Sequence, residues 1–217
     1  DEKSAKYVNS PDTPLFKKSE VLFALNLAKN YIRKYNFTIL AEGQFDVVML
    51  HQAGFRNAVG VSGTALADTL VGANGVNNLG LVKRLSPNLI LAFDADNAGI
   101  KAAKRSAEIA LRLGMDVKVI SIPPDAGKDP ADFIQSKGKD GFSALLKDAK
   151  HIIEFAAQKI KDTAKDERDL GKRITINVLP DIAALPTQTE KPFSIKPPSH
   201  ITRLDTEPLT KHVTRIP

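Results

Sequence analysis

Short apolar runs alternate with longer amphipathic segments over the first two thirds of the chain. The run at 89–93 is continuously apolar, too short for a helix and preceded by Pro87. This pattern is typical of a strand that is buried on both faces. Further short strands are predicted at 37–42, 57–61 and 116–122.

Predicted helices lie between and beside these strands. Apolar positions recur at helical spacing over 21–32, after a possible N-cap at Ser19, and over 44–53 and 98–113. Gly54 stands where the second of these helices should end. The alternation of strands and helices predicts an α/β fold: a mostly parallel sheet with right-handed crossovers and helices on both faces.

The pattern changes near residue 139. Helices are predicted at 142–149, 152–164 and 168–185 without strands between them, which indicates a helical subdomain after the sheet. Residues 187–217 are rich in proline and have little periodicity, so an irregular tail is expected there. At the other end, turn residues at 9–14 lead us to expect that the sequence begins partway through a longer protein.

Acidic residues follow two of the predicted strands. Glu42 closes the strand at 37–42, and Asp94 and Asp96 follow the strand at 89–93. Ligands bind at the carboxyl ends of parallel strands, so we expect these side chains to meet at one edge of the sheet. The alternative is that Asp94 and Asp96 only cap the helix that follows them.

The loop after the strand at 116–122 brings more acids to the same edge. Asp129 and Asp132 are predicted there, at the start of another helix. Asp46, in the first turn of the helix at 44–53, either supports the site or only interacts with the helix dipole.

The amino-acid composition excludes some kinds of site and favours some kinds of partner. The chain has 217 residues, a formal charge of +6 and no cysteine, so neither a disulfide framework nor a Cys-type zinc site is expected. No apolar run approaches the length of about 18 residues that a membrane span needs, and no signal-peptide pattern opens the sequence. We therefore expect a soluble protein without a membrane partner, and the positive charge suits a polyanion such as nucleic acid.

Clustered carboxylates favour a hard divalent cation. Like charges held close together raise one another's pKa, and Mg²⁺ relieves this by taking oxygen ligands while sharing phosphates of the substrate. Such a site suits phosphoryl or nucleotidyl transfer, strand cleavage or phosphate hydrolysis. No Gly-x4-Gly-Lys-Ser/Thr loop is present in the sequence, which disfavours an ordinary ATPase.

Several motifs together resemble a known family. Ala41-Glu42-Gly43-Gln-Phe-Asp46 and Phe93-Asp94-Ala-Asp96-Asn-Ala-Gly99 resemble the Toprim signature of bacterial primases, topoisomerases and related nucleases. The basic stretch at 6–18, the loop at 60–64 and Lys128-Asp-Pro-Ala-Asp132 follow the order found in DnaG-type primases. The resemblance covers roughly residues 4–185.

The resemblance implies a role for each matching residue. Glu42, Asp94 and Asp96 would hold catalytic Mg²⁺, which Mn²⁺ can replace, with Asp129 as a further ligand and Asp46 and Asp132 in support. Many relatives read Asp-Pro-Asp where this chain has Asp129-Pro130-Ala131, which leaves the number of metals open unless Asp132 substitutes. Four cations are candidates for contact with template or nucleotide phosphates, and solvent-facing positions are the alternative for all of them: Lys17, Lys18, Lys83 and Arg84.

The family also implies an activity and partners. We expect DNA-directed synthesis of short RNA primers on single-stranded DNA from nucleoside triphosphates, in the bacterial cytoplasm, by part of a catalytic core. A replicative helicase would bind through a domain absent here, and the zinc-binding module would also lie outside this sequence. A Toprim nuclease or topoisomerase-like strand cleaver is the alternative, although the three tyrosines all precede the predicted sheet.

On this reading the chain divides into four parts. Residues 1–36 end an N-terminal lobe and form a linking helix, 37–138 form the Toprim domain, 139–186 the helical subdomain and 187–217 the tail.

Overall fold

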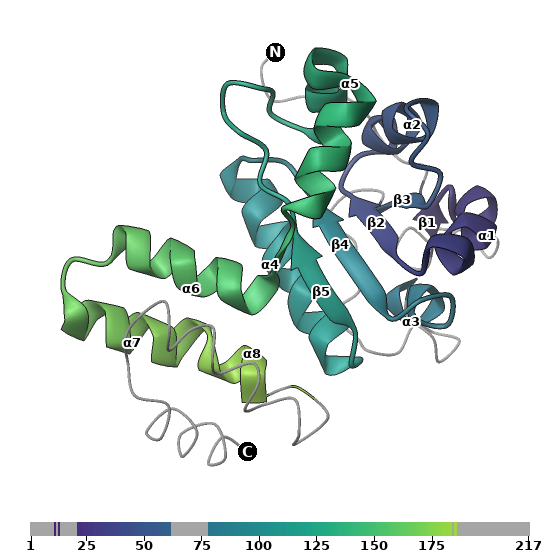
Figure 1. Ribbon diagram of the computed structural model, residues 1–217. Helices are drawn as coiled ribbons and strands as arrows, with labels where there is room; N and C mark the ends of the chain where they lie inside the picture. Colours follow the sequence, from purple (N-terminus) through teal and green to yellow (C-terminus); the bar gives the residue numbers. More distant parts are fainter. Residues whose placement is uncertain (1–10, 12, 14–20, 62–77, 184, 186–217) are drawn as a thin grey trace.

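The centre of the fold is a six-stranded sheet with the order β1-β3-β2-β4-β5-β6. The computed structural model describes residues 11, 13, 21–61, 78–183 and 185. Figure 1 shows the central strands surrounded by helices. The strands are β1 (Leu22–Phe23), β2 (Thr38–Ala41), β3 (Ala58–Val61), β4 (Asn88–Ala92), β5 (Asp116–Val119) and β6 (Lys150–His151).

The four middle strands are parallel, and the two edge strands are antiparallel to their neighbours. This confirms the predicted mostly parallel sheet. The helices of the described residues are α1 (Leu25–Tyr35), α2 (Gln44–Gln52), α3 (Asn78–Lys83), α4 (Asn97–Arg112), α5 (Pro130–Lys147), α6 (Ile152–Thr163), α7 (Glu167–Asn177) and α8 (Leu179–Ala183).

Each face of the sheet carries its own core because successive strand residues point to opposite sides. In β4, Leu89 and Leu91 join a core that α1, α3, α4 and α6 to α8 cover. Ile90 and Ala92 join the other core, against α2 and α5. Helices on both faces therefore explain why the strand is continuously apolar from Leu89 to Ala92.

Several details of the predicted elements are wrong. Strand β6 lies between two helices where no strand was expected, and the helix predicted over 168–185 is divided into α7 and α8. The helix expected from residue 21 begins only at Leu25, because Leu22 and Phe23 pair with Val61 and Gly60 as an edge strand. The strand expected at 116–122 ends at Val119, although the Ile120 N–H still donates to the Leu91 carbonyl of β4 at 3.1 Å. The predicted N-cap Ser19 lies outside the described residues.

Helix α5 contains a break near the predicted end of the Toprim domain. Gly138 has φ 67° and ψ −170°, which is not helical, so two helices meet there. Phe142, after the break, is fully buried in the same core as Phe133, before it. Their rings lie 6.3 Å apart. The first helix after the break thus still packs on the sheet, and the predicted domain boundaries stay a prediction.

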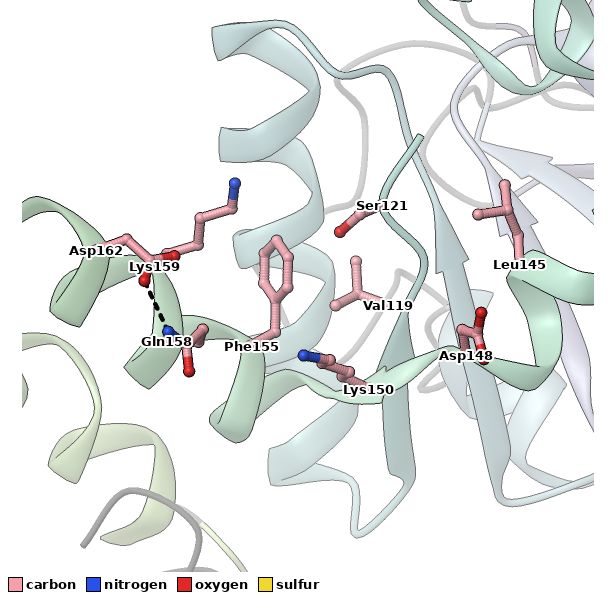
Figure 2. A pocket seen from close by; sticks show the side chains of 9 residues that line it. All are labelled: Val119, Ser121, Leu145, Asp148, Lys150, Phe155, Gln158, Lys159 and Asp162. Atoms are coloured by element: carbon pink, nitrogen blue, oxygen red, sulfur yellow. Dashed lines mark hydrogen bonds between the residues drawn. The ribbon is translucent and has the colours of Figure 1, made fainter. Parts of the chain in front are cut away.

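The helical part continues with α6, α7 and α8 beside β5 (Figure 1). Phe155 of α6 and the end of β5 line a pocket (Figure 2). No helix of the described residues is long and apolar enough to cross a membrane.

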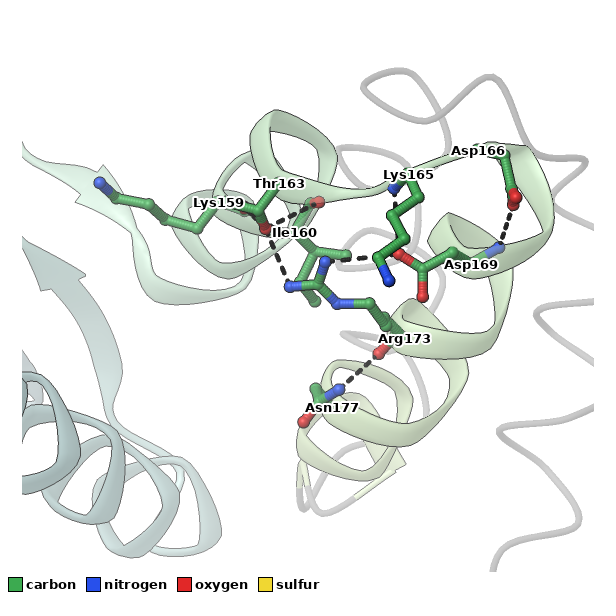
Figure 3. Close-up of polar contacts among 8 residues, drawn as sticks. All are labelled: Lys159, Ile160, Thr163, Lys165, Asp166, Asp169, Arg173 and Asn177. Carbon is green, nitrogen blue, oxygen red and sulfur yellow. Dashed lines mark hydrogen bonds and ion pairs between the residues drawn. The ribbon is translucent and has the colours of Figure 1, made fainter.

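Polar contacts join α6 to α7 (Figure 3). Arg173 donates to Thr163 Oγ1 at 2.9 Å and lies 3.6 Å from Asp169 Oδ2. Asp166 caps α7 by accepting the Asp169 N–H at 2.7 Å. The turn between the two helices is thereby fixed by side chains of both.

Candidate active site

Two carboxylates leave neighbouring strands at the carboxyl edge of the sheet. Glu42 follows β2 directly, and Asp94 lies two residues after β4. Ala41 and Ala92 are paired in the parallel register of these strands, so the residues that follow them emerge side by side. The sheet therefore brings together the two acids that the sequence placed at its edge.

Both carboxylates have an oxygen without a hydrogen-bond partner. Glu42 Oε2 and Asp94 Oδ1 are buried, and neither forms a hydrogen bond within the described part of the chain. Buried polar atoms are nearly always satisfied, so such a pair at a sheet edge points to a ligand that supplies the missing contact.

Other acidic residues near the carboxyl edge of the sheet affect the pKa values of Glu42 and Asp94. Burial and then the charges of four neighbouring carboxylates together raise the pKa of Asp94 to about 7; in order of size, the charges are those of Glu42, Asp46, Asp129 and Asp96. Burial, and then the charge of Asp96, also raises the pKa of Glu42. All five carboxylates thus act on one another, although three of them have additional structural roles.

Asp96 and Asp129 are helix caps. Asp96 Oδ1 accepts the N–H of Gly99 at 2.7 Å at the start of α4. Asp129 Oδ1 accepts the N–H of Asp132 at 2.7 Å at the start of α5. The capping interpretation is therefore correct for Asp96 and does not extend to Asp94, which lies before the cap.

Asp46 connects two helices. Its Oδ2 accepts the N–H of Gly43 at 3.0 Å, and its Oδ1 accepts the N–H of Ala131 at 3.1 Å. The pKa of Asp46 is raised to about 6 by burial, with the charge of Asp129 contributing to the rise and the hydrogen bond from Ala131 opposing it. The side chain thus does more than interact with the helix dipole, because it holds the start of α5 against α2.

Gly99 allows α4 to begin close to Asp94. A Cβ atom at this position would lie 2.3 Å from the Asp94 carbonyl oxygen, so another side chain would force the first turn away. A second backbone contact holds the same loop, since the Ala95 N–H donates to the Lys128 carbonyl at 2.9 Å. Sequence reasoning assigned Gly99 no role, although its fixed distance from Asp94 within the motif was the available signal.

The remaining predicted site residues lie elsewhere or outside the described residues. Asp132 is exposed and accepts the Lys128 N–H at 3.3 Å. Lys83 donates to the carbonyl of Leu113, which places it and Arg84 near the amino ends of β4 and β5, at the edge opposite the carboxylates. Lys17 and Lys18 lie outside the described residues.

The donor set fits a magnesium-like ion. Among the described residues, no three His, Cys, Asp or Glu side chains are placed close enough to enclose a metal by themselves. Mg²⁺ commonly takes only one or two carboxylates and keeps water or phosphate oxygens as its other ligands. The unpartnered oxygens of Glu42 and Asp94 match that requirement.

Comparison with known proteins shows which families and relatives this chain resembles. Residues 39–134 match a family model described as Toprim-like, and residues 1–29 match the N-terminal domain of the DNA primase catalytic core. A DNA primase of Clostridium acetobutylicum is 38% identical over 156 residues, which is 71% of this chain and 24% of that protein. A DNA primase of Aquifex aeolicus is 34% identical over 167 residues, which is 77% of this chain and 32% of that protein.

Solved structures of DNA primases have a fold similar to that of this chain. A primase domain from Pseudomonas aeruginosa has a TM-score of 0.78 at 27% identity and covers 99% of this chain and 65% of that one. The zinc-binding and RNA polymerase domains of the Aquifex aeolicus primase have a TM-score of 0.75 at 27% identity and cover 100% of this chain and 49% of that one.

The sheet with its carboxylate edge defines a Toprim protein. The chain belongs to the family of DnaG-type DNA primases and corresponds to part of their catalytic core. It spans only about a quarter to a third of the length of the two curated relatives. The family and the fold expected from the motifs are thereby confirmed.

Proposed function

We propose that this chain takes part in making short RNA primers on single-stranded DNA, as a piece of a DNA-directed RNA polymerase. The observation that carries the proposal is the pair of buried, unpartnered oxygens on Glu42 and Asp94. Family membership supports it, and one structural neighbour is a DnaG catalytic domain bound to single-stranded DNA.

Glu42, Asp94 and Asp96 are the residues that would hold Mg²⁺, or Mn²⁺ in its place, with Asp129 as the candidate ligand of a second ion. An ion held by these residues would supply positive charge for activation of an attacking hydroxyl and for stabilisation of the leaving pyrophosphate. Asp46 positions the site by joining α2 to the start of α5. Asp132 supports the loop through its contact with Lys128.

The chain's charge suits the substrates in this proposal. A net charge of +6 attracts both a DNA template and nucleoside triphosphates. Lys17 and Lys18 are proposed to contact the phosphates of template or nucleotide, and Lys83 and Arg84 to contact DNA at the edge of the sheet opposite the carboxylates. A replicative helicase, binding through another domain, and the bacterial cytoplasm complete the proposed setting.

Strand cleavage of the topoisomerase type is less well supported. That reaction needs a nucleophilic tyrosine, but Tyr31 and Tyr35 lie in the second half of α1, which ends near the amino end of β2. The Tyr31 hydroxyl also accepts a hydrogen bond from Arg56 at 2.7 Å. Tyr7 lies outside the described residues.

Incorporation of labelled ribonucleotides tests the proposal against its alternative. The protein is incubated with nucleoside triphosphates, Mg²⁺ or Mn²⁺ and either single-stranded DNA or supercoiled plasmid. We expect incorporation that needs the single strand and is lost in Asp94→Asn/Asp96→Asn but not in Asp125→Asn, an exposed loop control. Metal-dependent nicking of the plasmid without incorporation would instead favour a nuclease.

A further inference from the structure

A pocket of about 370 Å³ lies where one side of α6 meets the end of β5 and the end of α5. Figure 2 shows the Phe155 ring rising between Lys159 on one side and Val119 and Ser121 on the other. Pockets that bind small ligands start at about this volume. None of the residues that line it belongs to the carboxylate edge described above.

An aromatic ring forms the centre of the pocket. Phe155 is half-buried and packs against the core that α4 and α6 share with the sheet. Val119 and Leu145 add apolar surface to the wall. An aromatic ring that packs against the core and is bordered by apolar side chains can stack with a planar group.

Two cations flank the ring. Lys159 Nζ lies 5.6 Å from the centre of the Phe155 ring, and Lys150 of β6 lines the same pocket. Neither ammonium group forms an ion pair within the part of the chain that the structure describes. No carboxylate neutralises either charge there, and Lys159 lies over one face of the Phe155 ring, which leaves the other face for a stacked group.

The other polar groups suit a ligand that also donates hydrogen bonds. The Asp162 carboxylate already accepts from the Gln158 amide at 2.7 Å. Asp148 and the hydroxyl-bearing Ser121 lie at the other wall of the pocket (Figure 2). An exposed carboxylate opposite an aromatic ring can accept from the ring or amino N–H groups of a stacked base.

The pocket adjoins the carboxylate edge. Ser121 lies two residues after β5, as Asp94 lies two residues after β4, and these strands are parallel neighbours. Neighbouring strands are about 5 Å apart, so the pocket begins roughly one strand beyond the proposed catalytic carboxylates.

We propose that this pocket binds one nucleotide, with the base stacked on Phe155 and the phosphate held by Lys159 and Lys150. The nucleotide is either a free mononucleotide or one unit of a nucleic-acid strand that passes the carboxylate edge. The second source rests on the proposed function, whereas the first is independent of it.

The test measures nucleotide binding to the pocket in a protein whose proposed metal site is removed by mutation. Asp94→Asn/Asp96→Asn protein in EDTA is titrated calorimetrically with AMP and with ribose 5-phosphate, and by fluorescence anisotropy with a labelled twelve-nucleotide oligo(dT). Phe155→Leu removes the aromatic ring but keeps apolar packing. Lys150→Gln/Lys159→Gln removes the two charges, and Lys161→Gln, on the same helix but outside the pocket, is the matched control.

We expect AMP to bind at least tenfold more tightly than ribose 5-phosphate. Phe155→Leu should raise the dissociation constant of AMP by about 5- to 150-fold, the usual effect of removing an aromatic ring on which one base stacks. The double lysine variant should weaken binding of AMP and reduce its salt dependence, and Lys161→Gln should change neither. Unfolding midpoints of the variants show whether each protein is folded.

The oligonucleotide separates the two sources. If Phe155→Leu weakens the oligo(dT) as well as AMP, a strand occupies the pocket; if it weakens AMP alone, a free nucleotide does. The proposal is overturned if the parent protein binds neither probe, if Phe155→Leu binds both unchanged, or if Lys161→Gln acts like the double lysine variant. Failure here leaves metal binding by Glu42 and Asp94 unaffected, so it is distinguishable from failure of the proposed function.

Discussion

Replacing Asp94 by asparagine should stabilise the metal-free protein at high pH, although it removes a proposed catalytic group. Burial and four neighbouring carboxylates raise the pKa of Asp94 from 3.8 to about 7. The folded state therefore disfavours the ionised form. Its cost is absent below pH 3.8, grows as the pH rises toward about 7, and is complete above that value.

The size of the effect follows from the pKa difference. Going from 3.8 to about 7 spans about three factors of ten in the protonation equilibrium. At about 1.4 kcal/mol for each factor, the upper bound is about 4 kcal/mol. Because Asp94 is only half-buried and solvent screens its charge, we expect about 2 kcal/mol.

Urea denaturation in EDTA measures this difference. Asp94→Asn should exceed the parent protein in free energy of unfolding by about 2 kcal/mol at pH 8 and by almost nothing at pH 4. Asp125→Asn, in an exposed loop, should behave like the parent at both values. A variant that is less stable than the parent at pH 8, or a difference that does not vary with pH, would refute the electrostatic account of this edge.

Further variants test the packing around the site. Gly99→Ala should lose about 1–3 kcal/mol of stability in urea because its Cβ would meet the Asp94 carbonyl, whereas Gly171→Ala, a helical position with nothing within 4 Å, should gain about 0.5–1 kcal/mol. Phe142→Ala should lose about 3–5 kcal/mol in the same assay, since the ring is fully buried. Asp46→Ala should lose about 1–2 kcal/mol, and Asp46→Asn less, because only the amide keeps an acceptor oxygen for the backbone.

Each of these has an outcome that would contradict its premise. Equal stabilities of the Gly99→Ala and Gly171→Ala proteins would mean that α4 does not need its close approach to Asp94. A loss below 1 kcal/mol for Phe142→Ala would mean that the helix after Gly138 is not part of the sheet's core. If Asp46→Asn were as unstable as Asp46→Ala, the charge of the side chain would matter more than its hydrogen bonds.

The central sheet could be predicted because its signal is local. Each residue of β4 from Leu89 to Ala92 faces one of two cores, so this part of the strand is continuously apolar and stands out in the sequence. The edge strands β1 and β6 have only two residues each and show no period. Leu22 is part of a strand only because Val61, 39 positions along the chain, pairs with it.

The sequence could predict which acidic residues form the candidate site, but not which of them cap a helix and which keep an unpartnered oxygen. Parallel strands that end in Glu42 and Asp94 are sufficient to place those residues together. Whether an acid caps a helix or is left unpartnered depends on loop geometry, which separates Asp96 from Asp94 although they are two residues apart. The contact between Asp46 and Ala131 spans 85 positions and has no local pattern.

Binding of Mn²⁺ tests the central claim most directly. Mn²⁺ is titrated calorimetrically into the protein with and without a nucleoside triphosphate, and the same titrations are made with Asp94→Asn/Asp96→Asn and with Asp125→Asn. The account predicts binding that strengthens when nucleotide is present, persists in the Asp125→Asn control and disappears in the double variant. Equal binding by the parent protein and the double variant would contradict it, because these carboxylates would then have no part in holding a metal.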